Sequence, residues 1–283
     1  MDIAIHLGAH RTDEDLLVRT LMENSDRLGP KGIVVPPLGR ARPAIRKALQ
    51  TGGGSGASGL AEELAGGGAS RMVLSHEGFL GIFAKVLSNS AIYSDAANRA
   101  VTLRDLFPGH DLRFFLAVRN PATFLPAVFA ASSLTDFSDF VRGHDLSRIR
   151  WSDPIRAIRA ACPEIPLTVW CNEDLPLIWP DVLHTVAGTD DPMSGEDAIL
   201  REVMTAPGLR RFDAYLRDKP IGSRVVWRKV AAAFLGKYAD AEKVEEEIAL
   251  PGWSDAIIAG LSDLYERDVA TIAKMADVTF LAP

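Results

Sequence analysis

The sequence has few cysteines and no long apolar run, and both shortages exclude classes of protein. Its 283 residues include two cysteines, Cys162 and Cys171, which are too few for a disulfide framework and are not spaced like a metal knuckle. A reduced, cytoplasmic setting is therefore expected. No apolar run reaches the length of a bilayer span, and no basic segment followed by an apolar stretch opens the chain. Neither a membrane partner nor a signal peptide is expected.

Blocks of positive charge are also missing. The net charge is −6, from 31 lysines and arginines against 37 aspartates and glutamates. A general nucleic-acid surface is therefore not expected, although a local basic pocket remains open. No group of His, Cys, Asp or Glu has the spacing of metal ligands, so no metal is expected either. The apolar share of 47% is ordinary for a globular protein.

Short apolar runs alternate with amphipathic stretches over the first 175 residues. The predicted strands are Ile3–Leu7, Gly32–Val35, Arg71–Ser75, Arg113–Val118 and Leu167–Trp170. The predicted helices between them lie near 15–28, 40–50, 78–88, 99–106, 123–131 and 153–161. Short, nearly all-apolar strands are typical of buried parallel strands, and their alternation with helices predicts βαβ units. The sequence predicts a three-layer α/β fold in which helices flank a central parallel sheet.

The strand pattern fades beyond Pro176. Helices are predicted near 179–187, 195–206, 208–217, 222–238, 240–248 and 254–274, with a last short strand at Val278–Leu281. We therefore predict a single domain, 1–283, in which 1–175 form the α/β core and 176–283 form a mainly helical cover.

A glycine-rich stretch, TGGGSGASG (Thr51–Gly59), precedes a short predicted helix at Leu60–Ala65. It resembles a phosphate cradle in composition, but it follows no strand and has no lysine placed to meet a phosphate. A surface loop is the simpler interpretation, and a loop of this kind can still act as a lid.

Four polar fragments follow predicted strands. They are HLGAHRTDEDLL (His6–Leu17), SHEGFLG (Ser75–Gly81), RNPATFLPAVFAAS (Arg119–Ser132) and CNEDL (Cys171–Leu175). Ligands of open parallel sheets bind outside the carboxyl ends of the strands. The four fragments therefore predict one ligand site at that edge.

Taken together, the fragments resemble the sulfotransferase family, a branch of the P-loop nucleotide-binding architecture. The bacterial members with a G-A-H-K-T loop are the most similar, and the resemblance extends to PGWSDAIIAGLSDLYERDVATI (251–272). It implies that the first loop grips the 5′-phosphosulfate of the donor PAPS. It also implies that an Arg-x-Pro segment, with a serine eight residues beyond its arginine, grips the 3′-phosphate.

The match is partial when it is read residue by residue. The resemblance implies cofactor contacts by Gly8, Ala9, His10, Arg11, Thr12 and Arg119. Arg11 stands where the family has lysine, and the two side chains differ in shape. Asp13, Glu14 and Asp15 replace a small residue and a Thr/Ser pair, and Ala127 replaces the serine. A phosphate ligand is thus missing at each end of the expected donor site.

Two hypotheses follow from the acidic turn. Two like charges about 4 Å apart repel by about 4 kcal/mol at an effective dielectric of about 20, which weakens donor binding. Thr12 and Asp15 also have the spacing of a capping box, so the chain can supply the negative charge that a ligand supplies to helix amides elsewhere. The donor-free hypothesis predicts that Asp15 folds back onto the Thr12 amide and that no nucleotide-sized cavity exists. The enzyme hypothesis requires Arg11 and Arg119 to face one cavity.

If the chain is an enzyme, it transfers a sulfuryl group to a hydroxyl or amine of a small-molecule or glycan acceptor. The candidate catalytic residues are Glu77 as the base, with His10 as a rival, and Arg11 as the cation beside the leaving phosphate. His76 is a further rival. Glu77 could instead be a helix-cap acid or an ion-pair partner of Arg11 or Arg119, and His10 a hydrogen-bonded turn residue.

Other features have structural interpretations. His6 is expected in the core, and Glu173 and Asp174 are expected to pair with loop amides or an arginine. The basic stretch of Arg40, Arg42, Arg46 and Lys47 either steers an anion or is a solvated helix face, and Glu245–Glu247 are expected to be solvated. The five tryptophans lack a regular spacing and are expected in the core or an interface. A nucleotide triphosphatase is disfavoured because acids occupy the last three positions of its loop motif.

Overall fold

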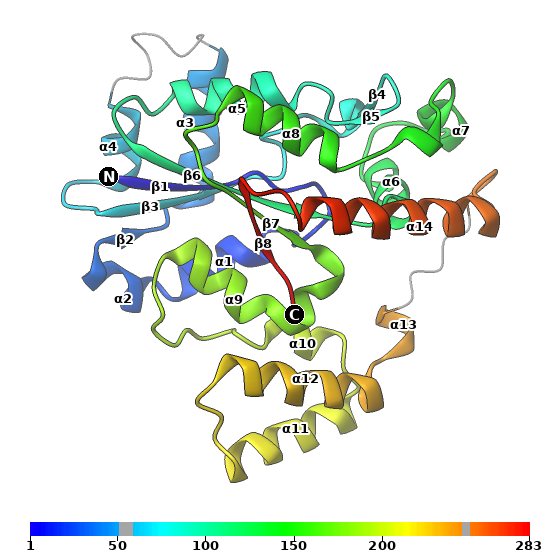
Figure 1. The fold of residues 1–283 in the computed structure, drawn as a ribbon. Helices are drawn as coiled ribbons and strands as arrows, with labels where there is room; N and C mark the ends of the chain where they lie inside the picture. The colour runs from blue at the N-terminus through cyan, green and yellow to red at the C-terminus, as the bar shows by residue number, and fades with distance from the viewer. Residues whose placement is uncertain (51–58, 245–249) are drawn as a thin grey trace.

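A six-stranded parallel sheet forms the centre of the molecule in the computed structural model, which describes residues 1–50, 59–244 and 250–283. In sheet order the strands are β2 (Ile33–Val34), β3 (Arg71–Ser75), β1 (Asp2–His6), β6 (Asp111–Val118), β7 (Leu167–Cys171) and β8 (Val278–Leu281) (Figure 1). All six predicted strands are present, so the predicted α/β class with a parallel sheet is confirmed.

The central strand β1 is hydrogen-bonded on both sides. Its last residue, His6, is level with Ser75 of β3 and with Phe115 of β6. The chain builds β2 and β3 on one side of β1 and then crosses to β6 on the other. In parallel sheets a crevice for ligands opens outside the carboxyl ends of strands at such a reversal. The loop that follows β1 therefore lies at the expected position of a site.

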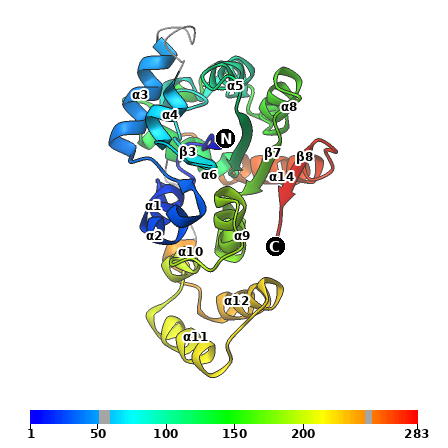
Figure 2. The ribbon, with the colours of Figure 1, turned by 90° about the vertical axis from the view of Figure 1, so that its left-hand side faces the viewer.

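Helices cover both faces of the sheet and complete three layers (Figures 1 and 2). One face is covered by α1 (Leu16–Glu23), α2 (Ser25–Leu28) and α9 (Leu175–Ala187). The other is covered by α3 (Leu38–Gln50), α4 (Leu60–Ala65), α5 (Ala96–Asp105), α6 (Pro121–Ala130), α7 (Phe137–Val141), α8 (Ser152–Ala161) and α14 (Asp255–Ile272). Shorter 3-10 helices lie at Gly29–Lys31, Phe83–Lys85, Leu146–Arg148 and Asn172–Asp174.

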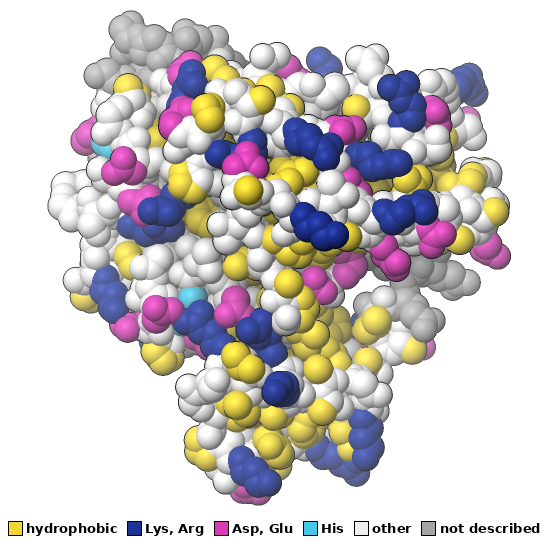
Figure 3. All heavy atoms as spheres, in the orientation of Figure 1, with side chains coloured by type: hydrophobic (Ala, Val, Ile, Leu, Met, Phe, Trp, Pro, Cys, Tyr) yellow, Lys and Arg dark blue, Asp and Glu magenta, His cyan; other side chains and the backbone are white. Residues whose placement is uncertain are grey.

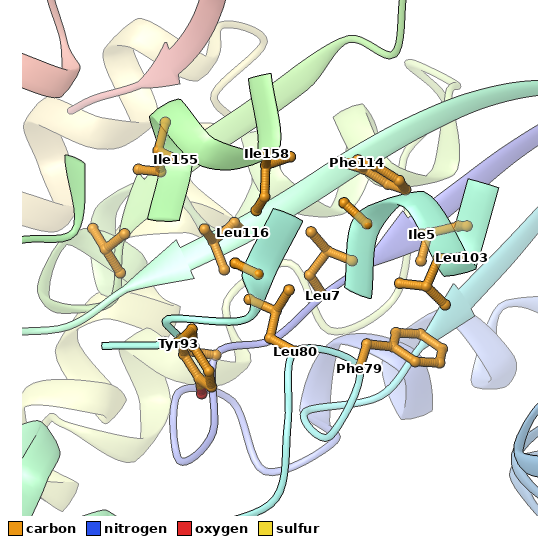
Figure 4. Close-up of a cluster of buried hydrophobic side chains, with 14 of the residues drawn as sticks. Ile5, Leu7, Phe79, Leu80, Tyr93, Leu103, Phe114, Leu116, Ile155 and Ile158 are labelled. Atoms are coloured by element: carbon orange, nitrogen blue, oxygen red, sulfur yellow. The ribbon is translucent and has the colours of Figure 1, made fainter. Parts of the chain in front are cut away.

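The two faces are assigned by the alternation of side chains along each strand. Ile5 of β1 and Leu116 of β6 point into the larger core, where they meet Leu103 of α5 and Ile158 of α8 (Figure 4). Ala4 points to the opposite core, beneath α1 and α9. The strands are therefore buried on both sides, which explains their nearly continuous apolar sequences.

The second half of the chain divides into two parts. The helices α10 (Ala198–Glu202), α11 (Ala206–Asp218), α12 (Arg224–Tyr238) and α13 (Ala241–Val244) follow α9, and α10, α11 and α12 share a small separate core around Phe212. Then α14 and β8 return to the main core and to the edge of the sheet. The helix predicted near 195–206 is shorter than expected, and part of that predicted near 240–248 lies outside the described residues.

The helix predicted near 78–88 is wrong. That segment holds the 3-10 turn at Phe83–Lys85 and the first strand of a small hairpin, β4 (Leu87–Ser88) and β5 (Ala91–Ile92). The two residues between these strands, Asn89 and Ser90, both have positive φ, as a tight hairpin turn with right-handed strand twist requires. Glycines in GFLG also disfavour a helix. The short helix α7 was not predicted.

Two further predictions concern segments outside the sheet. The predicted helix at Leu60–Ala65 is confirmed as α4, whereas the glycine-rich stretch before it lies outside the described residues except for Gly59. Among the residues that the structure describes, no helix has the length and hydrophobicity needed to cross a bilayer.

A buried carboxylate fixes α14 to the start of α8. Oδ2 of Asp268 accepts hydrogen bonds from the amides of Trp151 at 2.6 Å and Ser152 at 3.0 Å, and Asp268 is buried. These are the amides of the N-cap residue and of the first residue of α8, where no helical carbonyl is available to them. The carboxylate therefore replaces the missing acceptors.

We predict that Asp268→Ala lowers the free energy of unfolding by about 2–3 kcal/mol, because two buried amides lose a charged acceptor. Urea unfolding followed by circular dichroism measures the change. The matched control is Asp263→Ala, on the exposed side of the same helix, which should change stability by less than about 0.5 kcal/mol. Equal effects of the two substitutions would contradict the structural role of Asp268.

Candidate functional site

The loop after β1 continues the hydrogen bonding of the strand. The amide of Leu7 donates to the carbonyl of Phe115 at 2.8 Å, and the amide of Ala9 donates to that of Ala117 at 3.2 Å. Gly8 has a φ of +100°, and a Cβ there would lie 3.0 Å from Cα of Glu77. Only glycine fits this conformation and this close approach. The loop is thus held between the ends of β6 and β3.

The chain itself caps helix α1. The hydroxyl of Thr12 donates to the carbonyl of Ala9 at 2.8 Å, and Oδ2 of Asp13 accepts from the amide of Leu17 at 3.0 Å. The N-cap residue is Asp15, in a left-handed conformation with φ of 70°. The predicted capping box of Thr12 and Asp15 is therefore wrong in its residues. Capping by an acid of the chain is confirmed, with Asp13 in that role.

Asp15 is bound by an arginine of α3 instead. Nη1 of Arg42 donates to Oδ2 of Asp15 at 2.9 Å, and Nη2 bonds Oδ1. The prediction that Asp15 folds onto the Thr12 amide is therefore wrong, because its carboxylate binds Arg42. The interpretation of Arg42 as part of a solvated helix face is also wrong, because the side chains of both residues are largely covered. Burial raises the pKa of Asp15, but the hydrogen bonds from Arg42 and the charge of Arg42 lower it by more, so the net shift of the pKa is downward.

Glu77 holds the backbone of the loop. Its Oε2 accepts from the amide of Arg11 at 3.2 Å, whereas the Arg11 side chain forms an ion pair with Glu14 at 2.6 Å. Burial is the largest cause of the raised pKa of Glu77, and the charge of Asp15 adds to it. Glu77 therefore forms neither the helix cap nor the ion pair with Arg11 or Arg119 that the sequence left open as alternatives.

His10 is enclosed by aromatic rings. Its Nδ1 lies 2.6 Å from the hydroxyl of Tyr93, which also accepts from the His10 amide at 3.1 Å, and its ring centre is 4.4 Å from that of Phe83. Burial lowers the pKa of His10 to about 4. A neutral imidazole accepts, at its Nδ1, the hydrogen bond that the tyrosine hydroxyl donates. This geometry agrees with the interpretation of His10 as a hydrogen-bonded turn residue.

The two other histidines of the fragments also lie in covered positions. Burial lowers the pKa of His76 to about 4, and the charge of Arg42 adds to the effect. His6 is buried, with Nδ1 at 2.9 Å from Oγ of Ser75 and its ring stacked on Trp170. The predicted core position of His6 is confirmed.

Arg119 links the polar segment after β1 to the polar segment after β6. Its Nη1 donates to the carbonyl of Arg11 at 2.5 Å and its Nε to the hydroxyl of Thr123 at 3.2 Å. The residue is buried, and its own carbonyl accepts from the indole of Trp151 at 2.8 Å. The guanidinium therefore ties the first loop to the start of α6.

Glu173 joins three elements at the same edge. Its Oε1 accepts from the amide of Asn120 at 2.7 Å, and its Oε2 accepts from the hydroxyl of Tyr265 at 2.8 Å. The Asn120 side chain in turn caps α6 by accepting from the amide of Ala122 at 3.0 Å. The prediction that Glu173 pairs with a loop amide is confirmed.

A cavity of about 720 Å³ opens beside these residues. This volume is in the range of small-molecule sites. Arg11 and Arg119 both line it, so the cavity meets the requirement of the enzyme hypothesis, and the predicted absence of a nucleotide-sized cavity is wrong. The described residues that line it do not include Gly8, Ala9, His10 or Glu77. Their assignments as cofactor-binding or catalytic residues stay predictions.

The cavity wall is mixed in chemistry. Its charged residues are Arg11, Arg19, Arg119 and Lys243 against Asp13, Glu14, Glu173 and Glu202. Most of its apolar residues come from the second half of the chain, among them Leu175, Leu177, Ile199, Val203, Leu235 and Val244, and α1 adds Leu16. Sequence reasoning missed this wall, because apolar helix positions that line a cavity have the same pattern as positions that fill a core. Within the described residues, no cluster of three or more His, Cys, Asp or Glu could hold a metal ion.

Comparison with known proteins adds no relative. No protein-family model matches the chain, and no curated protein and no solved structure matches it either.

The Asp15–Arg42 pair generates a pH prediction. Because the pKa of Asp15 is lowered in the folded protein, the pair stabilises the fold above about pH 4, the range in which the unfolded carboxyl is ionised. This stabilisation is lost as the pH falls through the folded-state pKa. We therefore expect Asp15→Asn to lower the free energy of unfolding at pH 7 and to have little effect near pH 2.

Urea unfolding of both proteins across this pH range measures the difference. Asp26→Asn, at an exposed position of α2, is the matched control and should follow the unsubstituted protein at every pH. A deficit of Asp15→Asn that stays constant down to pH 2 would show that charge pairing with Arg42 is not its cause.

Proposed function

We propose that the protein is a divergent, sulfotransferase-like member of the P-loop architecture that binds an amphiphilic small molecule in the cavity and does not take PAPS. The parallel sheet, the loop between β1 and α1, and the polar segment at the end of β6 support the family assignment. The observation that carries the donor-free part is the hydrogen bond from the Leu17 amide to the Asp13 carboxylate.

The Asp13 carboxylate occupies the position that a bound anion would take at the start of α1. First-turn amides of a helix attract phosphate because they lack internal acceptors and lie at the positive end of the helix dipole. In this chain a carboxylate already satisfies one of them. A phosphosulfate placed there would displace Asp13 and would meet its charge at close range, at a cost of about 4 kcal/mol at 4 Å and an effective dielectric of about 20.

The cations of the cavity are engaged as well. Arg11 is paired with Glu14, and Arg119 bonds the Arg11 carbonyl and the Thr123 hydroxyl. Among the described residues that line the cavity, four side chains are cationic and four are acidic, so they offer no excess of positive charge to a donor that carries several negative charges. A ligand with few charges matches this balance better.

The shape of the lining indicates the class of ligand. The loops after β1, β6 and β7 contribute polar and charged groups such as Arg11, Arg119 and Glu173, and the second half of the chain contributes apolar residues such as Leu177, Ile199 and Leu235 beside Glu202 and Lys243. A molecule with a polar head and an apolar body satisfies both parts, because its body removes apolar surface from water while its head keeps polar partners.

One specific observation favours a second candidate, PAPS-dependent sulfuryl transfer. Arg11 and Arg119, the two cations that this reaction needs, line the same cavity. In that case Arg11 would leave Glu14 to neutralise the leaving phosphate. Glu77 would have to release the Arg11 amide before acting as the base toward the acceptor.

Calorimetric titration separates the two candidates. We expect no heat with PAP, the desulfated donor product, at low or moderate salt, and none with ATP, because Asp13 occupies the loop amide. Micromolar PAP binding that is lost in Arg11→Gln would instead favour the enzyme and justify a search for its acceptor. Arg11→Gln is a cleaner variant than Arg119→Ala, which removes a buried link of the loop.

The same method tests the amphiphile. Decanoate and octyl glucoside, below their micelle concentrations, represent a charged and an uncharged head on an apolar chain. We expect at least one of them to bind and Ile199→Asp to weaken it about tenfold or more, because a charge then faces the apolar wall. The control, Ile82→Asp, changes an exposed side chain outside the cavity lining. Absence of binding by both amphiphiles would contradict this part of the proposal.

A further inference from the structure

One helical hairpin has a net positive charge although the chain as a whole is acidic. Residues 206–238, which form α11, α12 and their connection, contain eight lysines and arginines and two aspartates. The hairpin therefore carries +6 in a chain of −6, and the remaining residues carry −12. Figures 1 and 2 show it at the end of the molecule farthest from the sheet.

Part of this charge is paired toward the body of the protein. Arg224 pairs with Asp181 of α9 at 3.5 Å and with Asp190, and Arg228 lies 4.0 Å from Asp181. These pairs orient one face of α12 toward α9. They leave the opposite face of α12 toward solvent.

That outer face of α12 combines apolar and cationic side chains. At 100° per residue, one face collects the exposed positions, which are Val225, Val226, Lys229, Ala232, Ala233, Gly236 and Lys237. Val225 is 53% exposed and Val226 is 48% exposed, and both are among the five large apolar side chains that the described residues leave exposed. The helix contains no acidic residue. Figure 3 shows yellow and dark blue side chains together over this end of the molecule.

We propose that the outer face of α12 docks on an anionic lipid bilayer. Lysines of a surface helix bind anionic headgroups, while apolar side chains between them enter the headgroup and acyl boundary. The two valines favour a bilayer over nucleic acid, whose phosphates would use the lysines and leave the valines in water. The hairpin projects from the body of the protein, so it can reach a flat surface while the acidic rest of the chain stays farther away (Figures 1 and 2).

This inference departs from the expectation of no membrane partner, which rested on the lack of an apolar run long enough to span a bilayer. Docking at the interface needs neither a net positive chain nor a spanning helix. It is independent of the cavity and of its ligand, so failure of one proposal leaves the other standing.

Vesicle co-sedimentation tests the proposal with the full chain. We expect binding to phosphatidylcholine vesicles that contain phosphatidylglycerol, no binding to phosphatidylcholine alone, and weaker binding as salt is raised. The pair Lys229→Glu and Lys237→Glu should weaken binding about tenfold or more. The pair Val225→Asp and Val226→Asp should also weaken it about tenfold or more, because the valines no longer enter the interface.

A matched pair elsewhere serves as the control. Ile82→Asp with Lys85→Glu removes an exposed apolar side chain and an exposed lysine near β4 and should leave vesicle binding unchanged. Circular dichroism and thermal unfolding check that each variant is folded.

Three results would overturn docking on a bilayer. One is a lack of binding to anionic vesicles, and a second is binding that both α12 pairs leave intact. The third is binding of a duplex DNA oligonucleotide that the lysine pair abolishes and the valine pair does not, without vesicle binding, which would assign the face to nucleic acid.

Discussion

Hydrogen bonding of β1 to β3 on one side and to β6 on the other is the constraint on which the site depends. The ladder does not stop at His6, because Leu7 and Ala9 go on donating to β6. The backbone of the first loop is thereby held against β6 while Gly8 passes close to Glu77 after β3. A chain so confined places its next residues at one edge of the sheet, beside the ends of β6 and β7.

The acids of the loop are held by partners within the protein. Asp13 caps α1, Asp15 binds Arg42, and Glu77 accepts the Arg11 amide. Each carboxylate meets a donor that would otherwise need water or a ligand. The same residues that are unfavourable for a phosphate therefore stabilise the loop without one, which is the physical basis of the donor-free proposal.

The helices between α9 and α14 contribute both to the cavity wall and to the proposed docking face. On their inner side they contribute Ile199, Leu235 and other apolar residues to the cavity. On their outer side α12 presents valines and lysines to solvent. Because these helices have a small core of their own around Phe212, their outer face can vary without altering the packing of the sheet.

Local patterns in the chain were enough to predict the six strands, most of the helices and the edge where the polar fragments gather, because buried strands and amphipathic helices leave periodic patterns that depend only on near neighbours. It missed the hairpin of β4 and β5, whose turn depends on two residues with positive φ. Which acid or cation meets which partner depends on the packing of the whole fold: Asp15 binds Arg42, 27 positions away, and Arg119 binds the Arg11 carbonyl, 108 positions away. Such pairings, like the cavity wall, arise when distant segments are packed together, and no local pattern in the chain encodes them.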